Sequence, residues 1–238
     1  MGKKRAADSS SSVSSPPART LLRLGIFGVA FFGVVMVLLH MLNWGEMALH
    51  GRHVSNFAHM PGWWLWQAGL VGLGGGTLLI GMGLRRSLPV SGPPRWGFRA
   101  LELAGLCVVG MMMFKTDRID TPGYNTTFSG YVHDSFAVMS TFLICWSMLL
   151  FVAAARVDPA WRGVPGRGWT WPVATVSLAL VWMLGDVTPY WRIGAVVQRG
   201  VVLVMAAWLI TTGWRALAAA QGRATGTPQP TPPPRPTR

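Results

Sequence analysis

Long apolar runs alternate with short polar connections along most of this chain. Two of these runs cover residues 24–42 and 135–155, and neither contains Asp, Glu, Lys or Arg. A helix needs about 20 apolar residues to cross the hydrocarbon core of a bilayer. The pattern therefore predicts an all-α, polytopic transmembrane helical bundle with six spans, at Leu21–Leu42, Trp63–Leu84, Phe98–Phe114, Tyr131–Ala155, Trp169–Val187 and Ile193–Leu217.

The two ends of the chain differ from this apolar middle. Residues 1–20 are basic and Ser-rich, and residues 219–238 are rich in Pro and Thr. Segments of this composition cannot bury an apolar core, so we expect two disordered tails around a transmembrane domain at residues 21–218.

The distribution of charge predicts an orientation. The chain has a net charge of +13, but its basic residues lie between apolar segments, which points to a lipid bilayer and not to nucleic acid as the partner. Of the 21 Lys and Arg residues, 16 fall on one side of the predicted bundle and 5 on the other. By the positive-inside rule, both termini are cytoplasmic in a multi-pass protein of the plasma membrane.

A polar layer is predicted at the extracytoplasmic ends of the spans. The stretch "FSGYVHDSFAVMS" places His133 and Asp134 at the edge of an apolar run, where ionisable groups are costly unless they are solvated or paired. The predicted topology brings every histidine and most acidic residues to this side. Candidate catalytic residues are His133, Asp134 and Asp186, and candidate ligand-binding residues are Asp117, Asp120, Gln198 and Arg199.

Each of these residues also has a simpler interpretation. Asp134 would stabilise the helix dipole if it lies in the first turn of its helix. Asp117 and Asp120 would form solvated ion pairs with the neighbouring Lys115 and Arg118. Arg199 would extend outward to the interface, or pair with Asp134 inside the bundle because an unpaired arginine there is costly.

Histidine spacing raises a metal hypothesis. Glu46, His50 and His53 are spaced i, i+4 and i+7, so a helix would place them on one face. Together with His133, they offer a ligand set for zinc. Ordinary interfacial histidines explain the same pattern, and Gly51 weakens the helix.

Small residues in the spans predict close packing. Gly72 and Gly76 form a GxxxG spacing, which allows two membrane helices to approach closely. Cys107 and Cys145 lie inside apolar runs and are expected to be buried and free.

Four features together resemble a known family. They are the acidic loop "FKTDRIDTPG", the segment "GYVHDSFAVMS", the basic residue Arg156 followed by "DPAWRG", and the final span "GAVVQRGVVLVMAAWLITTGWRAL". In this order they resemble the domain of unknown function 998 family of six-span bacterial and archaeal membrane proteins, over roughly residues 20–218. The resemblance implies the six-span fold and marks His133, Asp134, Gln198 and Arg199 as signature positions. It implies no activity.

Two classes of function fit the sequence. The first is a non-enzymatic membrane protein whose polar layer binds a lipid or small molecule, or serves a sensory or assembly role. The alternative is a membrane-embedded enzyme acting on a lipid or isoprenoid at the outer leaflet, either a metal-dependent hydrolase or an acid-initiated cyclase. In the enzyme, His133 would be a general base or metal ligand, and Arg199 would bind an anionic head group.

Overall fold

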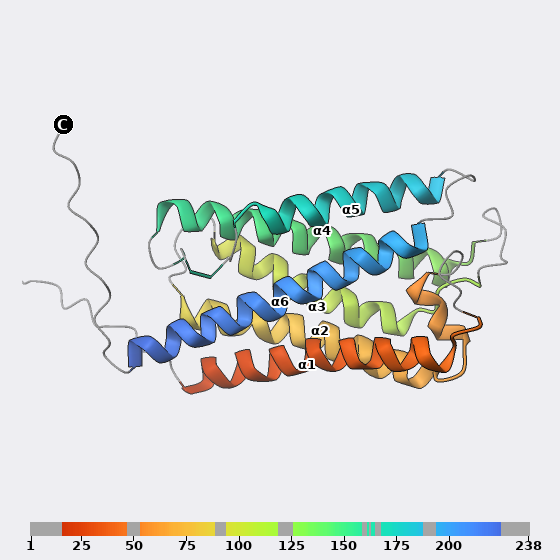
Figure 1. The fold of residues 1–238 in the computed structure, drawn as a ribbon, viewed down its shortest axis with the longest axis horizontal. Coiled ribbons are helices and arrows are strands. Elements are labelled where there is room, and N and C mark those ends of the chain that lie inside the picture. The colour runs from red at the N-terminus through yellow and green to blue at the C-terminus, as the bar shows by residue number, and fades with distance from the viewer. Residues whose placement is uncertain are drawn as a thin grey trace, which may run out of the picture.

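The computed structural model describes residues 16–46, 53–88, 94–118, 126–158, 161, 163–164, 168–187 and 194–224, with only the backbone at 16, 183–187 and 222–224. These residues form six long helices and one short 3-10 helix, with no strand among them (Figure 1). The elements are α1 (Pro16–Leu42), η1 (Val54–His59), α2 (Trp63–Ser87), α3 (Pro94–Met113), α4 (Phe128–Val157), α5 (Thr170–Val187) and α6 (Gly194–Ala224).

Local sequence signals explain where several helices begin. Pro16 and Pro94 stand at the first positions of α1 and α3, where proline's missing N–H costs nothing. Gly62 precedes α2 with φ of 83°, a left-handed conformation that favours glycine. The helices mostly extend past the apolar runs: α1 includes residues 16–20 and α6 reaches Ala224, although both segments were predicted to belong to the tails.

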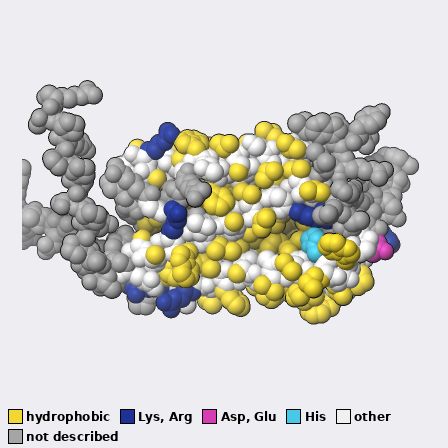
Figure 2. Space-filling model, in the orientation of Figure 1, with side chains coloured by type: hydrophobic (Ala, Val, Ile, Leu, Met, Phe, Trp, Pro, Cys, Tyr) yellow, Lys and Arg dark blue, Asp and Glu magenta, His cyan; other side chains and the backbone are white. Residues whose placement is uncertain are grey.

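Five helices are long and apolar enough to cross a membrane, namely α1, α2, α3, α4 and α6. In α5 the described apolar stretch is shorter, Thr170–Trp182. Large apolar side chains point outward from the bundle, among them Phe27 and Leu203, each 70% exposed. Figure 2 shows such side chains covering the middle of one face, with Lys and Arg toward its ends. A chain with this surface is a multi-pass membrane protein.

The helices are antiparallel and arranged as a ring. Each of α1 to α3 packs extensively against the next helix, and α6 packs against both α5 and α1. By comparison, α4 and α5 make few contacts with each other. We call one end of the bundle the arginine end, where α1 starts and α6 finishes, and the other the cavity end. The arginine end carries Arg19, Arg23, Arg85, Arg86, Arg95, Arg99, Arg156 and Arg215.

Glycines allow α1 and α2 to touch backbone to backbone. A Cβ added to Gly28 would lie 2.6 Å from the carbonyl oxygen of Gly72, and one added to Gly76 would lie 2.7 Å from that of Gly25. The predicted role of Gly72 and Gly76 in close helix packing is confirmed. Packing of this kind matters because lipid tails compete with apolar side chains, so van der Waals contact drives helix association in membranes.

Aromatic residues close the core at the arginine end. Trp161, which follows α4, is completely buried, and its ring centre lies 5.4 Å from that of Phe98 and 5.1 Å from that of Phe151. The "DPAWRG" sequence therefore has a structural role through its tryptophan. Cys107 and Cys145 are free and buried, as predicted.

Candidate functional site

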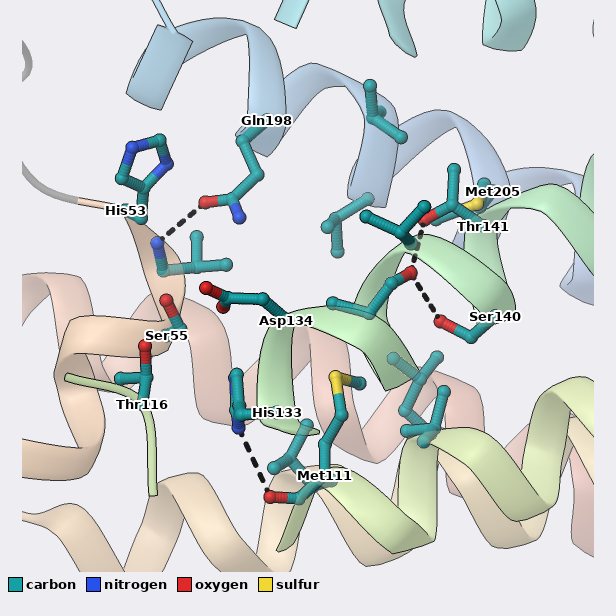
Figure 3. A pocket seen from close by; sticks show the side chains of 18 of the residues that line it. His53, Ser55, Met111, Thr116, His133, Asp134, Ser140, Thr141, Gln198 and Met205 are labelled. Carbon is teal, nitrogen blue, oxygen red and sulfur yellow. Dashed lines mark hydrogen bonds between the residues drawn. The ribbon is translucent and has the colours of Figure 1, made fainter. Parts of the chain in front are cut away.

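A cavity of about 500 Å³ lies among the helices at the cavity end (Figure 3). Its volume falls within the range of roughly 300–1,000 Å³ that is common for small-molecule sites. All six helices, η1 and the segment after α3 contribute to its wall. The polar lining residues are His53, Ser55, Asn56, Thr116, Asp117, Thr126, His133, Asp134, Ser140, Thr141 and Gln198.

The polarity of the wall changes with depth. Most of these polar residues belong to η1, to the connection before α4, or to the second turns of α4 and α6, and they surround the mouth. Farther along the helices, the wall is formed mainly by Leu70, Leu73, Val108, Ile144, Val201, Val202, Met205 and Leu209. The hydroxyls of Ser140 and Thr141 both donate to the carbonyl of Ala137, so this deeper part offers few free donors.

His133 is held from one side by the end of α3. Its Nδ1 lies 2.9 Å from the carbonyl oxygen of Phe114 and 3.2 Å from that of Met111. Carbonyl oxygens only accept, so Nδ1 must carry the proton and donate. His133 is only 3% exposed, so it lies inside the protein and not on the aqueous surface of the predicted polar layer. In the neutral ring, Nε2 is then an acceptor, and it has no hydrogen-bond partner in the described part of the chain.

The N-terminus of α4 is capped by other residues than predicted. Thr127 accepts a hydrogen bond from the Gly130 N–H at 3.0 Å, while its own hydroxyl donates to Asp117 at 2.6 Å. The backbone N–H of Thr127 also donates to Asp117, at 3.0 Å. Because α4 begins at Phe128, Asp134 lies in its second turn and not in the first. Asp117 thus fixes the start of α4 as an intrachain acceptor, a role that sequence spacing did not reveal.

Asp134 is exposed and lines the cavity mouth. Figure 3 shows its carboxylate directed between Ser55 and Gln198, away from His133. His133 and Asp134 therefore line the same cavity with side chains that point in different directions, since successive side chains on a helix are about 100° apart.

Gln198 connects α6 to η1. Its Oε1 accepts a hydrogen bond from the Val54 N–H at 2.9 Å, although the two residues are 144 positions apart. This bond orients the amide, so the NH2 group turns toward the cavity (Figure 3). The NH2 group makes no hydrogen bond to the residues that the structure describes. Gln198 is 8% exposed, so a polar group from a ligand would meet this donor in a mostly dry setting.

Arg199 faces a different neighbour. Its Nε donates to Nε2 of His40 at 3.0 Å, and its Nη1 donates to the carbonyl of Ala195 at 3.0 Å. His40 Nδ1 donates to the carbonyl of Met36, and its Nε2 accepts from Arg199, so the ring links α1 to α6. Arg199 is not among the residues that line the cavity. Its predicted pairing with Asp134 stays a prediction.

The structure brings together only two of the predicted zinc ligands among the residues that it describes. His53 and His133 both line the cavity, but no group of three candidate metal ligands gathers within the described residues. His53 lies in extended backbone before η1, so it does not continue a helix from Glu46. His50 and Asp120 lie outside the described residues, as does the side chain of Asp186. A zinc site using His50, His53 and His133 stays a prediction.

Sequence reasoning missed several residues at the mouth. Thr116 and Ser55 line it, and the carbonyl of Thr116 accepts a hydrogen bond from His59 at 2.6 Å. This hydrogen bond joins η1 to the segment after α3. No sequence pattern predicts it, because its two partners come together only when the whole bundle folds.

The chain belongs to the family described as "Protein of unknown function (DUF998)", whose profile matches residues 26–215. The resemblance seen in the sequence is therefore confirmed. No curated protein and no solved structure matches the chain significantly.

Proposed function

We propose that this member of the family binds a lipid-like amphiphile in the cavity, with the polar group of the ligand at the mouth and its chain in the apolar part. The observation that carries the proposal is the gradient along the wall, from hydrogen-bonding groups such as His133 and Gln198 to side chains such as Val201 and Leu209. A soluble polar ligand would leave the apolar half unused, and a plain hydrocarbon would leave the mouth groups unsatisfied.

The length of the cavity supports a single chain. Lining residues run from His133 to Ile144 on α4 and from Gln198 to Leu209 on α6. The eleven steps from the first to the last of these positions span about 16 Å at 1.5 Å per residue. This is close to half of the roughly 30 Å hydrocarbon core, which is the depth of one leaflet.

The few contacts between α4 and α5 support entry of the ligand from the bilayer. Val138 lines the cavity and is also 51% exposed, so the wall is thin beside this residue. Trp182 of α5 lines the cavity from the neighbouring helix. An amphiphile would slide in sideways between these two helices without leaving the membrane.

The orientation is part of this proposal. With α5 as the sixth span, its 18 residues give about 27 Å, slightly less than the hydrocarbon core. The arginine end would face the cytoplasm, both tails with it, and the mouth would open at the outer leaflet of the plasma membrane. Labelling of single cysteines placed at Trp44 and at Arg86 in intact cells tests this, with Trp44 expected to react with an impermeant reagent.

An enzyme acting on a bound lipid or isoprenoid is the second candidate. The observation in its favour is His133 itself, because a ring held through Nδ1–H presents Nε2 as a base. Asp186 or Asp117 would supply the acid, and zinc would join only if His50 and His53 completed a site with His133. Conversion of a bound lipid by the wild-type chain, lost in His133→Asn, would favour this candidate over binding alone.

Filling the cavity tests the binding function. Ala137→Trp places a large side chain in the cavity wall, whereas Val173→Trp places the same side chain on the lipid-facing surface, where Val173 is 58% exposed. We expect native mass spectrometry of gently solubilised protein to find a co-purifying amphiphile in the wild type and in Val173→Trp, and to lose it in Ala137→Trp. Thermal unfolding in detergent checks that both variants are folded, and Val202→Phe serves if Ala137→Trp is not. Equal lipid retention in folded variants of both kinds would refute the proposal.

A further inference from the structure

The hydrogen-bonding groups at the mouth form a complementary pair. His133 uses Nδ1–H to bind the carbonyls at the end of α3, which leaves Nε2 as an acceptor. Gln198 uses Oε1 to bind the Val54 N–H, which leaves its NH2 group as a donor. In both residues, a hydrogen bond inside the protein occupies one polar atom and leaves the other for a ligand. The mouth therefore offers one acceptor from α4 and one donor from α6.

The charges of the lining residues restrict which head groups the ligand can have. Asp117 and Asp134 bring two carboxylates to the wall, while none of the described lining residues is Lys or Arg. The nearest arginine on α6, Arg199, points its Nε at His40. A phosphate or carboxylate head group would therefore be desolvated beside like charges without a bidentate partner, which is unfavourable.

From these two observations we infer that the ligand of the cavity is an uncharged, hydroxyl-bearing amphiphile, and not an anionic one. Hydroxyl groups both donate and accept, so a head group with hydroxyls can satisfy the His133 Nε2 acceptor with one and the Gln198 NH2 donor with another. This inference rests on the proposed function, because it specifies the head group of the amphiphile that the cavity would hold. It also replaces the earlier expectation that Arg199 binds an anionic head group.

Three probes that share one alkyl chain test the inference. They are monododecanoylglycerol, which is neutral and carries hydroxyls, dodecyl phosphate, and dodecyltrimethylammonium. Each is titrated into the purified full-length chain in detergent micelles at equal mole fraction, and the bound fraction is read by native mass spectrometry. We expect the neutral probe to bind at least tenfold more tightly than the phosphate probe.

Two variants test the assigned groups. Gln198→Glu keeps an oxygen for the Val54 N–H but removes the NH2 donor, and His133→Asn keeps an N–H for the α3 carbonyls but removes the Nε2 acceptor. We expect each to weaken the neutral probe about tenfold, the usual effect of leaving one buried hydrogen bond unmade. Ser147→Ala is the control, because Ser147 donates to Gly97 far from the mouth. It should lower the unfolding temperature without changing the probe affinities.

The outcomes separate the two proposals. If none of the three probes binds the wild type, the proposed function itself fails. If the phosphate or the ammonium probe binds most tightly, the cavity binds amphiphiles but the inference about the head group is wrong. If both variants weaken the binding of all three probes equally, His133 and Gln198 do not recognise the hydroxyl, and the inference about the head group is again wrong. Should neither variant fold, the ranking of the probes on the wild type still decides.

Discussion

Replacing Gly28 by alanine should separate α1 from α2. The added Cβ would lie 2.6 Å from the Gly72 carbonyl oxygen and 3.2 Å from the Gly76 Cα. Non-bonded carbon atoms prefer separations of about 3.5–4.0 Å, so the overlap approaches 1 Å. Both obstructing atoms belong to the backbone, which cannot rotate away as a side chain would. The helices must therefore move apart along their contact.

Gly33→Ala is the matched control for this change. Gly33 is also on α1, but a Cβ there would meet nothing within 4 Å. Alanine improves helix stability by about 0.5–1 kcal/mol over glycine in both variants. Overpacking costs about 1–3 kcal/mol and applies only at Gly28. The difference between the two variants thus isolates the steric cost, and we expect Gly28→Ala to be less stable than Gly33→Ala by 1–3 kcal/mol on this scale.

Reversible unfolding in mixed micelles with increasing SDS measures this difference, with helicity followed by circular dichroism. The expected result is a lower midpoint for Gly28→Ala and an unchanged or higher midpoint for Gly33→Ala. Two midpoints that coincide would show that α1 and α2 do not depend on this backbone contact, and the account of their packing would be refuted.

Three other changes follow from single contacts. Gly130→Ala would drive a Cβ into the carboxylate of Asp117, so we expect about 1–3 kcal/mol lower stability in the same unfolding assay; an unchanged midpoint would contradict the capping role. Trp161→Ala removes a fully buried ring and should lower stability by about 3–5 kcal/mol, with a loss smaller than 1 kcal/mol arguing against the burial described. Arg199→Ala removes the bond to His40 and should cost about 1 kcal/mol without changing binding of the neutral probe, whereas a large loss of binding would place Arg199 in the site.

The sequence anticipated the helices better than their ends. Apolar length alone located all six long helices, but α4 begins at Phe128 and not at Tyr131. That difference moved Asp134 out of the first turn. The actual cap depends on Thr127 and on Asp117, which approaches from the preceding connection. Spacing along one segment could not reveal this contact between two connections.

Several of the candidate site residues line one cavity, and their functional roles stay predictions. His133, Asp134, Asp117 and Gln198 all line one cavity, as their shared side of the predicted topology indicated. The direction of each side chain was not available from the sequence. Burial of His133 against the end of α3 depends on how two helices pack, and so does the contact of Arg199 with His40.

The apolar runs are enough to predict a helical membrane protein of this family, because the length of a run is a property of consecutive residues and the bilayer thickness is fixed. The folded chain is needed to show that polar groups from η1, α4 and α6 surround one cavity, and which donor or acceptor each leaves open. Those properties depend on contacts between residues as far apart as Val54 and Gln198, and such contacts form only when the helices close into a ring.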